Sequence, residues 1–128
     1  MYFLDTTFIV GLLVSTDQWH EPAVEIYNQI KNEELVISKL VIAETITILK
    51  NKLSTKDIRE IYRNLPNMFK IIEDAAFFDE AMEIFIKYNS EISFFDSMYI
   101  FLMKNENILK LVSFDHDFDR VDGIIRIH

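Results

Sequence analysis

Cysteine is absent from this 128-residue sequence, and glycine and proline occur only twice each. A chain without cysteine forms neither disulfides nor thiolate metal sites, and an intracellular, cytoplasmic setting is the simplest expectation. Scarce glycine and proline argue against a disordered chain and against a small all-β fold rich in tight turns. The sequence therefore predicts a single compact domain over residues 1–128.

The sequence also lacks a hydrophobic run long enough to cross a membrane. Its N-terminal segment, MYFLDTTFIVGLLV, is apolar, but Asp5 interrupts it and no basic region precedes it. The segment is shorter than the ~20 residues that a spanning helix needs. We expect neither a targeting segment nor a membrane partner, and we interpret this region as a buried strand followed by a buried helix.

Basic residues are in deficit: 13 Lys and Arg stand against 21 Asp and Glu, for a net charge of −8. Such a balance disfavours contact with phosphate backbones. Residues 39–70, however, hold seven basic and three acidic residues, a local charge of +4. The basic residues there are Lys39, Lys50, Lys52, Lys56, Arg59, Arg63 and Lys70. This segment is compatible with RNA binding, although a solvated charged helical face explains it equally well.

Short strand-like runs alternate with helical ones along the chain. Apolar, β-branched runs predict strands at residues 2–4, 35–37, 69–72, 109–112 and 124–127. Helical spacing predicts a first helix that Thr6 or Thr7 caps and that runs to residue 13. It predicts further helices at residues 21–30, 40–49, 54–65, 74–88 and 94–103, with Pro66 following the fourth helix. This alternation predicts a three-layer α/β/α domain with a central, mostly parallel sheet and its last strand at an edge.

Four carboxylates interrupt strongly apolar segments: Asp5, Glu44, Asp96 and Asp115. Burial of an isolated carboxylate costs several kcal/mol or more, so each needs a partner, a proton or a cation. Sites in parallel α/β folds lie outside the carboxyl ends of strands, and Asp5 and Asp115 follow the ends of two predicted strands. Simpler interpretations exist for each: helix caps for Asp5 and Asp96, an ion pair with Lys39 for Glu44, and a solvated turn for Asp115.

A divalent cation would neutralise the four carboxylates together, because few basic residues lie near them in sequence. Oxygen donors without cysteine or a histidine pair favour Mg²⁺, with Mn²⁺ as a substitute, over Zn²⁺. Mg²⁺ held by one or two carboxylates keeps several waters and leaves room for a substrate phosphate. This chemistry suits hydrolysis of a phosphodiester.

Four short motifs occur in a fixed order over nearly the whole chain. They are Phe3-Leu4-Asp5-Thr6-Thr7, Ala43-Glu44-Thr45, Phe95-Asp96-Ser97 and Ser113-Phe114-Asp115-His116-Asp117-Phe118. In order and spacing they resemble the PIN-domain family, and within it the VapC-like ribonuclease toxins of type II toxin–antitoxin systems. One departure is Ser97, where the family often has Ala or another Asp.

The resemblance implies a PIN-like nuclease domain that cleaves RNA endonucleolytically with Mg²⁺. It implies Asp5, Asp96 and Asp115 as metal ligands, with Asp117 as a further candidate if a second ion binds. Glu44 would ligate a metal or orient the attacking water. Thr7 and Ser113 would support the carboxylates by hydrogen bonds. The resemblance further implies a cognate antitoxin protein and a homodimer.

Two other interpretations stay open at this stage. The chain could be a catalytically inactive PIN-like binding module. It could also be a receiver domain that accepts a phosphoryl group, since such domains share its size and its alternation of strands and helices. A receiver needs paired acids at the end of its first strand and a lysine after a later one. In this chain Leu4-Asp5 stands in place of the paired acids, and Ser113-Phe114-Asp115 stands in place of the lysine.

Overall fold

The computed structural model describes residues 1–128 and contains five strands and six α-helices. The strands are β1 (Tyr2–Leu4), β2 (Leu35–Ser38), β3 (Lys70–Ile72), β4 (Lys110–Val112) and β5 (Ile125–Ile127). The α-helices are α1 (Thr6–Leu13), α2 (His20–Ile30), α3 (Lys39–Leu49), α4 (Thr55–Met68), α5 (Phe78–Lys87) and α6 (Phe94–Asn105). Two 3₁₀ helices, η1 (Ala75–Phe77) and η2 (His116–Arg120), precede α5 and β5. None of the helices combines the length and apolarity that a membrane span requires.

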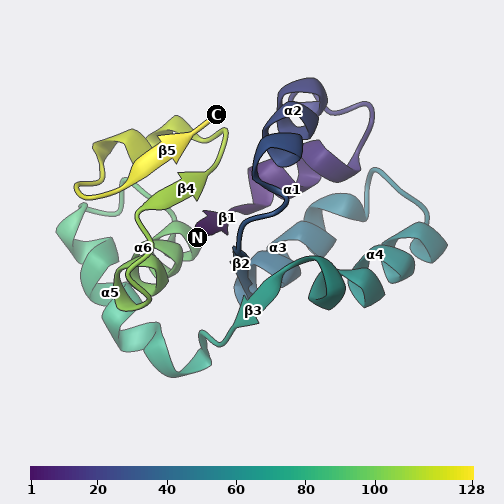
Figure 1. Cartoon of the computed structure of the whole chain (residues 1–128). Coiled ribbons are helices and arrows are strands. Elements are labelled where there is room, and N and C mark those ends of the chain that lie inside the picture. The colour runs from purple at the N-terminus through teal and green to yellow at the C-terminus, as the bar shows by residue number, and fades with distance from the viewer.

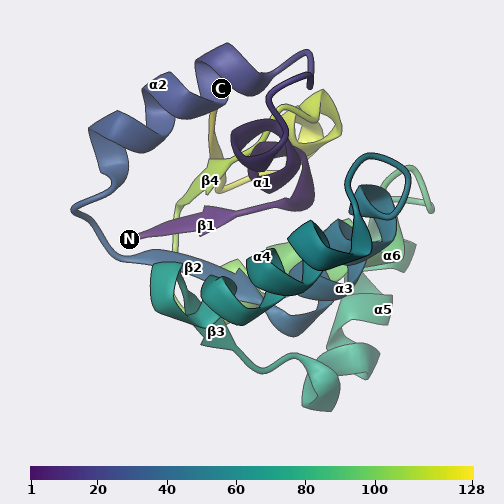
Figure 2. The same ribbon diagram turned by 90° about the vertical axis from the view of Figure 1, so that its right-hand side faces the viewer.

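The five strands form one sheet in the order β3-β2-β1-β4-β5, and every pair is parallel. Figure 1 shows α1 to α4 on one side of the sheet and α5 and α6 on the other, and the view in Figure 2 shows α3 and α4 side by side. The predicted three-layer α/β/α architecture is confirmed, and β5 lies at the predicted edge. A receiver has the strand order 2-1-3-4-5, so that interpretation of the chain is wrong.

The core consists of 26 buried residues that connect the sheet to both helical layers. Apart from Ser38 at the end of β2, the residues of strands β1 and β2 are hydrophobic, because helices cover both faces of the sheet. Helix α6 is buried around most of its circumference, between the sheet and α5. The ring of Tyr99 on α6 packs against that of Phe3 on β1, with 5.5 Å between centroids. The central strand and α6 are therefore held rigidly against each other.

Four of the six α-helices begin at side chains that accept hydrogen bonds from free backbone N–H groups, among them α4, which Ser54 caps. Asp5 caps α1 by accepting from Phe8 N at 3.1 Å, Ser38 caps α3, and Ser93 caps α6 by accepting from Asp96 N at 3.0 Å. The predicted cap at Thr6 or Thr7 is wrong, because the extended backbone of Asp5 already directs its carboxylate at the first turn. Capping by Asp96 is also wrong, since Asp96 lies within the first turn of α6.

Two helix boundaries differ from the sequence-based expectation. Helix α4 continues through Pro66 to Met68, because a proline in the last turn removes a single hydrogen bond, while the bond from Phe69 N to Leu65 O is kept at 3.0 Å. The helix expected from residue 74 is instead divided into η1 and α5. The Asp74 side chain accepts a 2.7 Å hydrogen bond from Leu40 N at the start of α3, so it joins two elements rather than starting one.

Candidate functional site

A cavity of about 270 Å³ opens at the carboxyl ends of the central strands β1 and β4. At this point the strand order reverses, because the chain continues from β1 to β2 on one side of the sheet and from β4 to β5 on the other. Such a switch in strand order is the usual position of a site in open α/β sheets. Nine residues line the cavity: Asp5, Thr6, Thr7, Glu44, Ile48, Ser93, Asp96, Asp115 and Asp117. The structure thus brings together all four carboxylates singled out from the sequence, and Asp117 with them. None of the lining residues is basic.

Asp5 is the most fully enclosed of these acids, with 3% of its surface exposed. Its Oδ1 accepts hydrogen bonds from the Thr7 hydroxyl at 2.7 Å and from Phe8 N at 3.1 Å, while Oδ2 accepts one from the Ser113 hydroxyl at 2.5 Å. Thr7 Oγ1 in turn accepts from Phe114 N at 2.9 Å. The end of β1 and the end of β4 are therefore joined through the Asp5 carboxylate and these two hydroxyls.

Glu44 reaches the cavity from α3 and is held by two hydroxyl groups. Its Oε1 accepts hydrogen bonds from Thr6 at 2.5 Å and from Tyr99 at 3.1 Å. Lys39 instead forms an ion pair with Glu73 at 3.3 Å, so the alternative interpretation of Glu44 as the ion-pair partner of Lys39 is wrong. Sequence reasoning missed Thr6 and Tyr99 as contributors to the site.

Mutual proximity and burial make the ionised forms of Asp5 and Asp96 costly. Burial raises the pKa of Asp5 to about 6, although the hydrogen bonds from Ser113 and Thr7 oppose this effect. The pKa of Asp96 rises to about 8, chiefly because of burial and then because of the negative charges of Asp5, Asp115 and Glu44. At Asp5 and Asp96 the cavity therefore favours a proton or a neighbouring cation over a bare carboxylate.

The segment after β4 carries the remaining acids and is anchored by Arg126. Asp115 caps η2 by accepting from Asp117 N at 2.9 Å. Arg126 on β5 binds both carboxylate oxygens of Asp119, at 2.8 and 2.9 Å, and donates to the Ser113 carbonyl at 3.1 Å. This planar, bidentate contact fixes η2 to the edge of the sheet. Arg126 was not identified from the sequence, although it is the one charged residue in an apolar strand.

The donor set of the cavity fits a hard divalent cation. Its ligands would be carboxylate and hydroxyl oxygens alone, with no nitrogen or sulfur donor among the lining residues. No three acidic or histidine side chains already surround a common point as ligands would. Binding of an ion therefore requires that carboxylates rotate toward one another, a change that repulsion between their negative charges opposes unless a cation is present.

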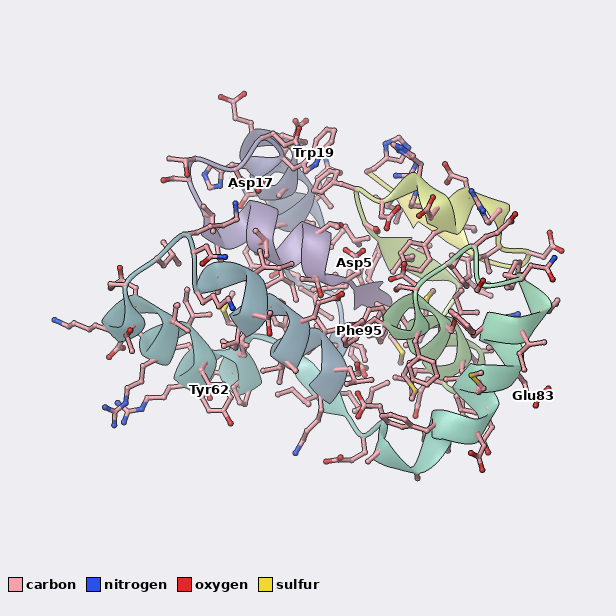
Figure 3. The ribbon with its side chains drawn as sticks, turned by 180° about the vertical axis from the view of Figure 1, so that it is seen from behind. Asp5, Asp17, Trp19, Tyr62, Glu83 and Phe95 are labelled. Atoms are coloured by element: carbon pink, nitrogen blue, oxygen red, sulfur yellow. The ribbon has the colours of Figure 1, made fainter.

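The basic segment lies elsewhere. Lys39, Arg59 and Arg63 line a separate groove of about 920 Å³ between α3 and α4, together with apolar side chains. Figure 3 shows Tyr62 of this groove well away from Asp5. Because residues of α3 line both spaces, this helix separates the groove from the carboxylate cavity. The local charge of +4 thus does not border the carboxylates.

Comparisons with known proteins agree with this arrangement. Residues 2–124 match the family model of the PIN domain, whereas no curated protein matches the chain in sequence. The fold is similar to that of VapC20 from Mycobacterium tuberculosis, described as a Sarcin-Ricin loop cleaving toxin, with 21% identity, 97% of each chain covered and a TM-score of 0.86. It is also similar to a toxin–antitoxin complex from Klebsiella pneumoniae (15% identity, 98% of this chain and 96% of that one, TM-score 0.75) and to FitAcB from Neisseria gonorrhoeae (17% identity, 100% and 97%, TM-score 0.74).

Proposed function

We propose that this chain, which belongs to the PIN-domain family, is a cytoplasmic endoribonuclease that depends on Mg²⁺ or Mn²⁺ and acts as the toxin of a toxin–antitoxin pair. The observation that carries the proposal is a cavity walled by five carboxylates and no basic side chain, at the switch point of a parallel sheet. Such a concentration of negative charge would repel an RNA phosphate unless a cation mediated the contact.

The residues of the cavity would divide the work as follows. Asp5, Asp96 and Asp115 would hold the ion, with Asp117 available for a second one. Glu44 would ligate the ion or orient the attacking water. When bound, the ion would lower the pKa of a water molecule and offset the charge that develops on the phosphate. Thr7 and Ser113 would hold the Asp5 carboxylate in place by the hydrogen bonds described above.

Incubation of the purified chain with single-stranded and structured RNA tests this proposal. We expect cleavage with Mg²⁺ or Mn²⁺, its loss with EDTA, and a decrease of at least about 100-fold for Asp5→Asn, since one of the proposed ligands loses its charge. Asp79→Asn is the matched control, because Asp79 is an exposed acid on α5 outside the cavity. Cleavage that survives both chelation and Asp5→Asn would disprove the proposal.

An inactive PIN-like module is the second candidate, favoured by the absence of three ligands around a common point. Mn²⁺ binding, followed through the electron paramagnetic resonance of the free ion, distinguishes the two. The nuclease proposal predicts binding that Asp5→Asn abolishes. An inert module would bind no Mn²⁺ through Asp5.

The toxin role is supported by one similar structure described as a toxin–antitoxin complex, and by structures described as VapBC2 and VapBC bound to DNA. A cognate antitoxin would inhibit by bringing an Arg or Lys side chain into the acidic cavity, where it would replace the cation. Co-expression with the product of a short neighbouring gene tests this idea. The role predicts a stable complex in which RNA cleavage is suppressed, and cleavage unchanged in such a complex would contradict it.

A homodimer completes the proposed assembly. Phe78, Met82 and Ile86 are exposed and spaced four residues apart, so they form one apolar stripe along α5. A second copy of the chain would cover this stripe. Sedimentation should give a dimeric mass for the wild type and a monomeric mass for Met82→Glu. A monomeric wild type would contradict the assembly.

A further inference from the structure

We propose that Tyr99, together with Thr6, is a positioning residue that fixes Glu44 by holding one of its carboxylate oxygens and leaving the other for the cavity. The bond itself is a property of the fold, whereas its effect on RNA cleavage rests on the proposed nuclease function.

The contact joins three helices at a single oxygen atom. Thr6 is the first residue of α1, Glu44 lies in the middle of α3, and Tyr99 lies in the buried helix α6. Oε1 of Glu44 accepts both hydroxyl hydrogen bonds, at 2.5 and 3.1 Å. The protein supplies no hydrogen bond to Oε2, and Glu44 is among the residues that line the cavity. The two hydroxyls thus determine which oxygen of Glu44 is available to a ligand.

Tyr99 is well suited to this task. Its side chain is fully buried (0% exposed), and its ring packs against Phe3 of the central strand. The hydroxyl therefore stands on a rigid support, and Glu44 is its hydrogen-bonding partner. Burial first, and then the charge of Glu44, raise the pKa of Tyr99 far above its usual range, so the group stays protonated and remains a donor.

Positioning of Glu44 matters because the other acids of the cavity repel it. An unrestrained glutamate has three side-chain torsions and would rotate toward solvent, away from Asp5, Asp96 and Asp115. Two hydroxyl donors oppose that rotation, and hydrogen bonds to a charged acceptor are stronger than neutral ones. The carboxylate is kept at the wall of the cavity before any ligand binds.

Tyr88 offers a matched control within the same chain. Its hydroxyl is also buried but has no hydrogen-bond partner. Tyr88→Phe and Tyr99→Phe therefore each remove a buried hydroxyl, the first from a half-buried ring and the second from a fully buried one, and only the second change removes a contact to Glu44. Both variants keep the aromatic ring, so the packing of the core is preserved.

The first experiment measures the bond without any assay of cleavage. Urea unfolding of wild type, Tyr99→Phe, Glu44→Ala and the double variant gives the coupling between the two side chains. We expect a coupling of about tenfold in the unfolding equilibrium constant, equivalent to about 1.4 kcal/mol. The same cycle with Tyr88→Phe should give none. A coupling for Tyr99 no larger than that for Tyr88 would overturn the proposal.

The second experiment measures cleavage of RNA. We expect Tyr99→Phe and Thr6→Val each to lower kcat about tenfold with KM within twofold of wild type, while Thr6→Ser and Tyr88→Phe retain wild-type kcat. A wild-type kcat in Tyr99→Phe, or an equal loss in Tyr88→Phe, would overturn the positioning role. Absence of cleavage by the wild type would instead disprove the nuclease function, and the unfolding cycle would still decide whether Tyr99 holds Glu44.

Discussion

Replacement of Asp96 by Asn should stabilise the protein in the absence of divalent cations. Asp96 is 9% exposed, and its pKa rises from 3.8 to about 8 because of burial and the neighbouring carboxylates. The folded state therefore retains a proton that the unfolded state releases above pH 4. By linkage, the stability present below the unfolded pKa is progressively lost as pH increases toward 8. A neutral, isosteric amide does not incur this loss.

The size of the effect follows from the shift in pKa. Each unit corresponds to about 1.4 kcal/mol, so the upper limit at pH 8 is ~6 kcal/mol. Water in the cavity raises the effective dielectric constant, and we expect a gain of about 1–2 kcal/mol for Asp96→Asn. In a domain of this size that gain raises Tm by roughly 4–8 °C. Mg²⁺ should raise the Tm of the wild type and leave that of Asp96→Asn nearly unchanged.

Differential scanning fluorimetry with EDTA, between pH 4 and pH 9, measures the prediction. The difference in Tm between Asp96→Asn and wild type should be close to zero near pH 4, increase up to pH 8 and then become constant. Asp79→Asn, an exposed neutralisation of the same kind, controls for the loss of net negative charge. A variant that is equally or less stable than wild type at pH 8, or a difference that does not depend on pH, would refute the reasoning.

Three further predictions concern the framework of the site. Arg126→Met should increase the rate of hydrogen exchange at the amides of η2, because the bidentate contact with Asp119 is lost, and unchanged exchange would contradict the anchoring role. Gly11→Val should lower stability by about 1–3 kcal/mol in urea, since an added Cβ already meets Trp19 at 3.3 Å, and a neutral result would show that α2 shifts freely. Phe118→Ala should cost about 3–5 kcal/mol, because this ring is 1% exposed, and a loss below about 1 kcal/mol would contradict its burial in the core.

The local pattern of the sequence was sufficient to predict the architecture. Each apolar strand or amphipathic helix is recognisable from a window of roughly ten to fifteen residues. The alternation of these elements predicted the parallel, three-layer fold that the structure confirms. Errors arose where a local signal competed with a distant contact. Pro66 suggested a helix end, but burial of Leu65 and the backbone bond from Phe69 keep the last turn of α4. Asp74 suggested a helix start, but its carboxylate binds the backbone of α3.

The residues of the candidate site likewise fall into those that a local sequence signal identifies and those that it does not. Asp5, Glu44, Asp96 and Asp115 were found because a charge within an apolar segment is visible in the sequence, and the structure places them around one cavity. The residues that hold them are less conspicuous. Tyr99 is separated from Glu44 by 55 positions, so no local pattern connects the two residues. The sequence did contain a signal for Tyr99, since a residue three positions after Asp96 lies on the same face of a helix.

The basic segment shows the limit of a charge count. Residues 39–70 are basic in total, but total charge does not determine the direction in which each side chain points. Helix α3 directs Glu44 to the carboxylate cavity and Lys39 to the groove beside α4. Side chains five positions apart on a helix point in different directions, so one segment serves two unlike surfaces.

The position of β1 between β2 and β4 has a consequence for the timing of synthesis. Phe3 is paired with Leu111, and Asp5 is bonded to Ser113, across more than a hundred residues of intervening chain. The cavity therefore cannot assemble while the ribosome is still making the last strands, so the proposed ribonuclease activity should be absent from an incomplete chain. Ribosome-bound chains arrested before residue 105 should show no RNA cleavage, and detectable cleavage by them would contradict this view.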